Sequence, residues 1–290
     1  MRIKLLTHQN NMHHGPGVVV KNLLAGLQGL DAQVVSINEE ADCCVCLHNP
    51  LLFRDRWEEV DIVGPNSFVI PSSETTASFI DFLVPSQWVK DTYSSYECMN
   101  GKNIYIWPVG VDTEDWRPSH IPVENRPLDC LIYYKNADVS LMKDVQDLCT
   151  RHNLSTGLLQ YGAYKEDDLK NAMHTAKFCI LVTRTESQGM AYMQILSSNM
   201  PCFVFEKPEW DDQAPVGVCA ATSVPYFDER CGKKVLQSAT IEEKHESFSA
   251  FLEKFNNGEY NPRKYILENH TLEIGAKKFL SILQEVKSRK

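Results

Sequence analysis

The sequence lacks a long apolar run: nowhere in its 290 residues do the roughly 18 consecutive apolar residues occur that a membrane-spanning helix needs. It also lacks an apolar leader, because polar side chains follow Met1 almost at once, so we expect an opening β-strand and no secretion signal. A basic excess is missing too, since the formal net charge is −9, which disfavours general nucleic-acid binding. These absences predict a cytoplasmic protein with no transmembrane segment and no nucleic-acid partner.

Motifs of metal and dinucleotide chemistry are absent as well. Cys43 and Cys46 form a Cys-x-x-Cys spacing among the ten cysteines, but no second pair follows at zinc-site distance. The chain has no Asp-x-Asp triplet that could face a divalent ion, and no Gly-x-Gly-x-x-Gly follows an apolar run. We therefore expect reduced cysteines that pack in the interior, no bound metal and no cofactor. The missing glycine motif also disfavours a Rossmann oxidoreductase, an alternative that binding of NADH would support.

What is present favours two domains of ordinary size. The 290 residues are 43% hydrophobic and 23% charged, which leaves room for two cores in a globular protein. Residues 117–127 contain three prolines in eleven positions and no periodicity, a pattern typical of an interdomain connector. Strand-like apolar runs and helical patterns alternate on both sides of this connector, which indicates the α/β class.

The most informative stretch runs from Phe178 to Phe205. Its apolar block at 179–182 predicts a strand buried on both faces, and apolar residues at helical spacing then predict a short helix that ends before Pro201. Glu186 therefore lies at the carboxyl end of a strand and the amino end of a helix. Open α/β sheets bind ligands at this place, and a helix start offers backbone N–H groups to an anion.

This stretch resembles the signature of retaining glycosyltransferases of the family 4 type, which have the GT-B fold. The signature reads Glu-x-Phe-Gly-x-x-x-x-Glu-Ala-x-x-x-Gly-x-Pro, and Glu186, Gly189 and Pro201 match it. Gln194 replaces the second glutamate, and Gln188 replaces the phenylalanine. The alternative interpretation of the stretch is an ordinary βαβ unit without a functional role.

A second resemblance to the same family lies in the first half of the chain. Val84-Pro85-Ser86-x-Trp88 and Pro108-x-Gly110-Val111-Asp112 match the usual end of its amino-terminal domain. The resemblance implies an α/β protein with two Rossmann-like domains that face each other across a cleft. The domains would be residues 1–120 plus 271–290 and residues 121–270, with the C-terminal helix crossing back to the first domain. The compact second domain resembles that of virus-encoded members.

The resemblance assigns Lys135 and Lys143 to the donor diphosphate. Family members end the first strand of the second domain at an arginine, whose position Lys135 takes, and Lys143 is the candidate for a lysine that follows. A solvated side chain is the alternative for Lys143. Backbone N–H groups at the helix start would stabilise the same negative charge; they belong to Ser187, Gln188, Gly189 and Met190.

Glu186 and Lys135 are the implied catalytic residues. Glu186 would accept hydrogen bonds from hydroxyls of the donor sugar and would stabilise positive charge on the ring. Gln194 would accept a hydrogen bond from the ribose without the assistance of a charge. Tyr164, or Tyr161 near it, would stack on the nucleotide base, although a buried tyrosine fits the pattern equally well.

Further candidates lie in the first domain. Gly15 and Gly17 occupy the turn after the first strand, where family members carry a Gly-Gly pair that lines the donor cleft. His14 beside them is either a solvated loop residue or an acceptor-side contact. Many members carry a histidine after the fourth strand, and this chain does not; Asn66 or Ser72 could supply a hydrogen bond there.

The resemblance predicts a metal-independent, retaining hexosyltransferase. The donor would be a nucleotide-diphosphate sugar of the GDP-mannose or UDP-glucose type, and the acceptor a glycan, a glycoprotein or another hydroxyl compound. A homodimer is compatible with the sequence. The alternatives are a catalytically weak or inactive nucleotide-sugar-binding protein and an epimerase on the same fold.

Overall fold

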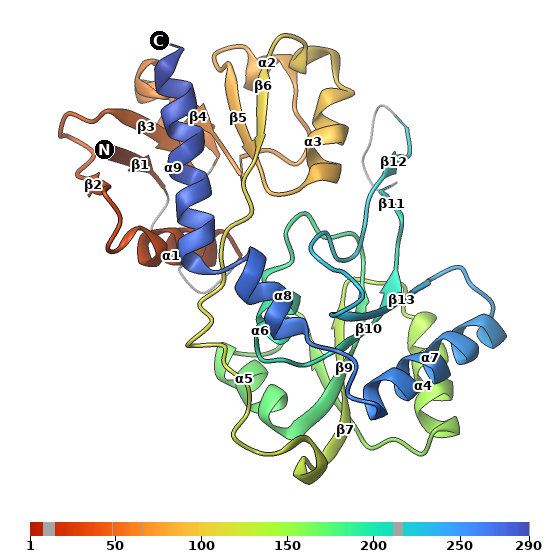
Figure 1. Ribbon diagram of the computed structural model, residues 1–290. Coiled ribbons are helices and arrows are strands. Elements are labelled where there is room, and N and C mark those ends of the chain that lie inside the picture. Colours follow the sequence, from red (N-terminus) through yellow and green to blue (C-terminus); the bar gives the residue numbers. More distant parts are fainter. Residues whose placement is uncertain (8–14, 48, 66, 211–216, 290) are drawn as a thin grey trace. The chain divides into compact units, whose positions relative to one another are not determined.

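A computed structural model describes residues 1–7, 15–47, 49–65, 67–210 and 217–289 of the chain (Figure 1). His14 and Asn66, both named above as candidate site residues, lie outside these ranges. The chain divides into two compact units, each with its own parallel sheet. The first unit comprises Met1–Gly110, His270–Lys290 and the described part of Asp211–Cys219, and the second comprises Val111–Trp210 and Ala220–Asn269. Within the described ranges, no helix combines the length and the apolar character needed to span a bilayer.

The first unit is built on a six-stranded parallel sheet in the order β2-β1-β3-β4-β5-β6. Its strands are β1 (Arg2–Leu6), β2 (Gln33–Val35), β3 (Cys43–Cys46), β4 (Ile62–Val63), β5 (Asp81–Val84) and β6 (Asn103–Ile106). Its helices are α1 (Gly15–Leu27), α2 (Ser73–Thr76), α3 (Gln87–Ser94), α9 (Leu272–Ser288) and the 3₁₀ segments η1 (Pro50–Glu59) and η2 (Glu97–Met99).

Helix α9 completes the core of the first unit, although it lies at the other end of the sequence. It packs against α1 (Figure 1), and the ring of Phe279 lies 4.8 Å from that of Trp107. Trp107 also donates a hydrogen bond of 2.9 Å from Nε1 to the carbonyl of Gly275. A Cβ atom on Gly275 would lie 2.5 Å from the backbone nitrogen of Gly110, so glycine is required for this close approach.

The second unit contains a five-stranded parallel sheet in the order β13-β10-β9-β7-β8. Its strands are β7 (Leu128–Lys135), β8 (Thr156–Gln160), β9 (Ala176–Thr183), β10 (Cys202–Glu206) and β13 (Gly232–Leu236). Its helices are η3 (Val123–Asn125), α4 (Leu141–Arg151), α5 (Glu166–Thr175), α6 (Met190–Ser197), α7 (Ile241–Asn256) and α8 (Pro262–Asn269). The short strands β11 (Glu209–Trp210) and β12 (Cys219–Ala220) form a separate pair.

Alternation of side chains along β9 divides the core of the second unit between the two faces of its sheet. Cys179 and Leu181 pack with residues of α5, α6 and α8 on one face. Phe178, Ile180 and Val182 pack with residues of α4 and α7 on the other. Because both faces are covered, β9 is an apolar run without polar alternation. Eight of the ten cysteines of the chain are buried in such packing positions.

Candidate functional site

The carboxyl ends of β7 and β9 bring Lys135 and Glu186 together. Lys135 is the last residue of β7 and pairs in register with Thr183, the last residue of β9. Glu186 follows three residues later in the loop before α6. The Lys135 Nζ atom lies 2.6 Å from Oε1 of Glu186, with 25% of the lysine side chain and 12% of the glutamate side chain exposed. The two residues named as catalytic from the sequence thus form an ion pair.

Burial determines the protonation behaviour of this carboxyl group. Desolvation raises the pKa of Glu186, and the opposing attraction and hydrogen bond of Lys135 do not cancel this effect. The ion pair with Lys135 therefore offsets only part of the rise in the pKa of Glu186.

Three tyrosines surround the ion pair. The Lys135 ammonium group lies 4.6 Å from the ring centroid of Tyr161, which is within the range of a cation–π interaction, and 44% of Tyr161 is exposed. The hydroxyl groups of Tyr133 and Tyr164 lie 3.1 Å apart. Burial, first of all, raises the pKa of both phenols, and the negative charge of Glu186 adds to the shift. Both hydroxyl groups are therefore neutral donors at physiological pH.

Backbone hydrogen bonds hold the loop that carries Glu186. The Glu186 amide donates to the carbonyl of Thr222 over 2.9 Å. The side-chain amide of Gln237 donates to the carbonyls of Thr183 over 2.7 Å and of Phe205 over 2.9 Å, so it joins the ends of β9 and β10. The position of Glu186 is thereby fixed by chain segments far away in the sequence.

Gly189 makes the turn into α6 possible. Its φ of 75° lies in the left-handed region, which favours glycine, and a Cβ atom there would collide with the ring of Tyr192. The Tyr192 hydroxyl accepts a hydrogen bond of 3.0 Å from the amide of Tyr226, so this ring has little freedom to move away. At the start of the helical ladder, the amide of Met193 donates a hydrogen bond of 3.3 Å to the carbonyl of Gly189. The amide of Met190 precedes that ladder, as amides at a helix start do.

The other candidates of the second unit differ in exposure. Ser187 is exposed, whereas Gln188 and Gln194 are buried, with 6% and 8% of their surface accessible. No hydrogen-bond partner of the Gln194 side chain lies among residues 1–7, 15–47, 49–65, 67–210 and 217–289, so its amide is available to a ligand. Lys143 is exposed at the third position of α4. The ion pair of the site joins Lys135 and Glu186 and does not include Lys143.

The candidates of the first unit belong to a different sheet. Gly15 and Gly17 lie at the start of α1, the former exposed with open space at its Cβ position and the latter buried. Ser72 caps α2: its hydroxyl lies 2.9 Å from Oγ1 of Thr75 and accepts from the Thr75 amide over 3.3 Å. The Ser72 hydroxyl therefore already has a local structural role, and its acceptor-side role stays a prediction.

Two contributions to the site had weak or no signals in the sequence. Tyr161 follows directly after β8, and an aromatic residue at the carboxyl end of a strand is a signal that could have ranked it above Tyr164. Gln237 follows directly after β13, a strand that buries only Gly232 and Val235 and includes two adjacent lysines. Such a strand has no continuous apolar run, so the sequence offered no means of placing Gln237.

The site combines a cation, a largely buried carboxyl group, an exposed aromatic ring, backbone amides at a helix start and a buried side-chain amide. A cation with backbone amides suits a phosphate group, and a carboxylate suits the hydroxyl groups of a sugar. Among the residues that the structure describes, no group of three metal-ligating side chains comes together. These groups together are suited to bind a phosphorylated molecule that is rich in hydroxyl groups.

The architecture is the α/β fold of GT-B glycosyltransferases, with a parallel sheet in each of two domains. This assignment rests on the similarity of the chain to solved structures of glycosyltransferases. Sucrose-phosphate synthase from Thermosynechococcus elongatus matches with a TM-score of 0.64 at 9% identity, over 100% of both chains. The lipopolysaccharide outer core galactosyltransferase WaaB matches with a TM-score of 0.60 at 11% identity, over 98% of this chain and 99% of that chain.

A third similar structure is an alpha-glucosyltransferase solved with UDP and a 13-mer DNA that contains an HMU base. Its TM-score is 0.57 at 7% identity, over 98% of this chain and 99% of that chain. No protein-family model matches the chain, and no curated protein sequence matches it. At these identities the structural likeness establishes the fold alone.

Proposed function

We propose that the protein is a retaining glycosyltransferase that moves a hexose from a nucleotide-diphosphate sugar, of the GDP-mannose or UDP-glucose type, to a hydroxyl group of a glycan or glycoprotein. The observation that carries the proposal is the 2.6 Å ion pair of Lys135 with Glu186, at the carboxyl edge of a parallel sheet and next to a helix start. The GT-B fold of the similar glycosyltransferases supports the same class of reaction.

Lys135 is placed to serve two partners at once. An ammonium group has three N–H donors, and the ion pair with Glu186 uses one of them. The remaining donors suit oxygens of a departing diphosphate, whose charge the amides at the start of α6 also stabilise. Lys143 on α4 would add a second cation. In this proposal no divalent metal is needed to neutralise the leaving group.

Glu186 acts on the sugar side. As a carboxylate it accepts hydrogen bonds from the hydroxyls of the donor sugar and stabilises positive charge that develops on the ring. Gln194, whose amide has no described partner, accepts from the ribose, and the exposed ring of Tyr161 offers a surface for the base. The glutamine lacks the charge of a glutamate, so this ribose contact is a neutral hydrogen bond.

Titration calorimetry with UDP-glucose and GDP-mannose in the presence of EDTA tests the proposal. We expect saturable binding of at least one of them, and a Lys135→Met variant should bind it at least about tenfold more weakly, roughly 1.4 kcal/mol. Lys177→Met is the matched control, because Lys177 also forms an ion pair in β9, 2.8 Å from Asp129. Equal losses in the two variants, or no binding of either compound at millimolar concentration, would contradict the proposal.

A catalytically weak nucleotide-sugar-binding protein is the second candidate function, favoured by the neutral Gln194. Release of nucleoside diphosphate with a mixture of glycan acceptors distinguishes the two. Turnover in EDTA, with the anomeric configuration of the product read by NMR, supports the transferase. Tight binding without release supports the binding protein.

A further inference from the structure

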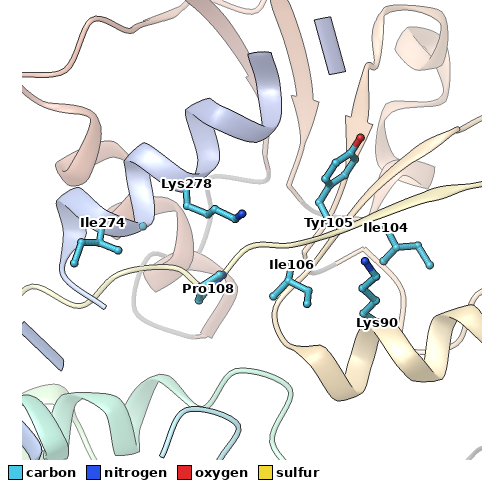
Figure 2. A pocket seen from close by; sticks show the side chains of 8 residues that line it. Lys90, Ile104, Tyr105, Ile106, Pro108, Ile274 and Lys278 are labelled. Atoms are coloured by element: carbon cyan, nitrogen blue, oxygen red, sulfur yellow. The ribbon is translucent and has the colours of Figure 1, made fainter. Parts of the chain in front are cut away.

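A cavity lies in the first unit, beside a different sheet from that of the Lys135–Glu186 pair. It encloses about 540 Å³ between β6, α3 and α9, within the approximate range of 300–1,000 Å³ for ligand pockets. Figure 2 shows the side chains around it. The lining is mostly apolar, with Ile104 and Ile106 from β6, and it includes one lysine from each helix, Lys90 of α3 and Lys278 of α9.

The wall of this cavity is the edge of a sheet. Strand β6 is the last strand in the order of the six-stranded sheet and pairs only with β5 among the described strands. The amides of Asn103 and Trp107 donate to carbonyls at the β5 side. In a parallel ladder alternate residues face the same neighbour, so Ile104 and Ile106 direct their backbone N–H and C=O groups to the open side.

Two cations flank this open edge. Lys90 on α3 and Lys278 on α9 reach toward β6 from its two sides (Figure 2). Neither ammonium group has a carboxylate partner within the described part of the chain. The chain as a whole is acidic, with a net charge of −9. The surface beside this cavity is locally basic instead, because Lys90 and Lys278 lack carboxylate partners among the described residues.

We propose that the edge of β6 binds an extended acidic peptide as an added strand. The peptide backbone would pair with Ile104 and Ile106, its apolar side chains would fill the cavity, and its carboxylates would meet Lys90 and Lys278. This proposal does not depend on the sugar-transfer reaction.

The backbone groups favour a peptide over a lipid. An acyl chain in the cavity would cover the N–H and C=O groups of Ile104 and Ile106 without bonding them, which is unfavourable for buried polar groups. A second copy of the chain is disfavoured by charge. Residues 102–108 contain a lysine and no carboxylate, so edge-to-edge pairing of two copies would add like charges to the site.

The probe is a fluorescein-labelled peptide of three Glu-Val repeats, with a Lys-Val peptide of equal length beside it. Fluorescence anisotropy should show saturable binding of the acidic peptide, and the Lys90→Glu/Lys278→Glu variant should weaken it at least about tenfold. Lys277→Glu is the matched control on the same helix: Lys277 is 61% exposed, pairs with Glu273, and does not line the cavity. It should change binding less than about twofold.

Backbone pairing has its own readouts. N-methylation of alternate peptide bonds should abolish binding, and the bound peptide should slow amide exchange at Ile104 and Ile106. No saturable binding, equal binding of the lysine or N-methylated peptide, or an unchanged affinity in the double variant would overturn the proposal. Binding of phosphatidylglycerol vesicles with no peptide binding would replace it with a lipid site, and concentration-dependent dimers broken by the double variant would replace it with self-association.

Discussion

Glu186 is an acid whose folded environment favours the protonated form, because burial outweighs the attraction of Lys135 and raises its pKa. Between its ordinary value of 4.5 and its raised value, the folded state holds a proton that the unfolded state has lost, so stability falls as pH rises through this window. The Glu186→Gln variant should therefore have a larger free energy of unfolding than the wild type at pH 7. This difference in stability should shrink below about pH 4.5. Urea unfolding at both pH values measures it.

The same variant tests the proposed reaction. Because glutamine cannot stabilise positive charge on the sugar ring, turnover should fall at least about tenfold, roughly 1.4 kcal/mol of transition-state stabilisation. Asp129→Asn is a contrasting control, since hydrogen bonds from Lys177 and Ser155 hold the pKa of Asp129 below its ordinary value despite its partial burial. That substitution should lower stability and leave turnover intact. Wild-type turnover in Glu186→Gln would remove Glu186 from the mechanism.

His270 predicts a second pH effect on stability, with the opposite sign. Burial lowers its pKa from 6.5 to about 4, so between these values the unfolded state takes up a proton that the folded state does not. The free energy of unfolding should therefore fall as pH is lowered through this window, by roughly 2–3 kcal/mol. His270→Asn should remove this slope when urea unfolding is compared at pH 7 and pH 4.5.

Other groups do not obscure that comparison. Asp42 and Glu59 have pKa values held below their ordinary range, so their loss of stability comes mainly at lower pH. The lowered pKa values of His152 and His174 act in both proteins and cancel in the difference. An unchanged slope in His270→Asn would contradict the assignment.

Among the elements, α9 is sensitive to side-chain volume at one position, Gly275. A Cβ on Gly275 would lie 2.5 Å from the Gly110 nitrogen, and backbone cannot give way as a flexible side chain can. Gly275→Ala should destabilise the chain by about 1–3 kcal/mol in urea unfolding. Gly15→Ala, with open space at the Cβ position, should change stability by less than about 0.5 kcal/mol. Equal effects would show that α9 shifts freely.

Elements with a strong hydrophobic period were predictable from the sequence. The apolar block at 179–182 lies inside β9. Helical spacing of apolar residues predicts further helices over 140–151 and 241–255, and these correspond to α4 and α7 within one residue at each end. Apolar residues at 20, 23, 24, 27 and 30 predict a helix over 18–30, whereas α1 spans Gly15–Leu27. Its end is earlier because Gly29 has a φ of 83°, the left-handed conformation that terminates helices.

The site was predictable only in part, for a physical reason. Lys135 and Glu186 each follow an apolar run, so their place at the carboxyl ends of strands can be read locally. Their contact requires β7 and β9 to be neighbours in register, which no local pattern encodes. The bond of the Glu186 amide to Thr222 joins residues 36 positions apart, through a stretch without clear periodicity. The roles of these residues in catalysis stay predictions.

At the scale of the whole molecule, the first unit depends on a helix that follows the second unit in the sequence. Helix α9 contributes Phe279, Ile282, Leu283 and Val286 to its core, each at most 3% exposed. Burial of such side chains is worth about 1.5–3 kcal/mol each, and their sum is comparable with the roughly 5–15 kcal/mol that stabilises a whole domain. We therefore expect the first unit to be unstable without α9.

A chain that ends at Asn269 tests this dependence. We expect amide exchange in β1 and β3 to become fast, since their sheet has lost the helix that covers it, whereas β7 and β9 keep their protection because the second unit has its own complete core. A chain that ends at Ser288 is the control: it loses the 2.6 Å ion pair of Arg289 with Asp81 and keeps α9, so β1 and β3 should stay protected. Protection of β1 in the chain ending at Asn269 would show that the first sheet folds without α9, and loss of protection in β9 would show that the two units unfold together.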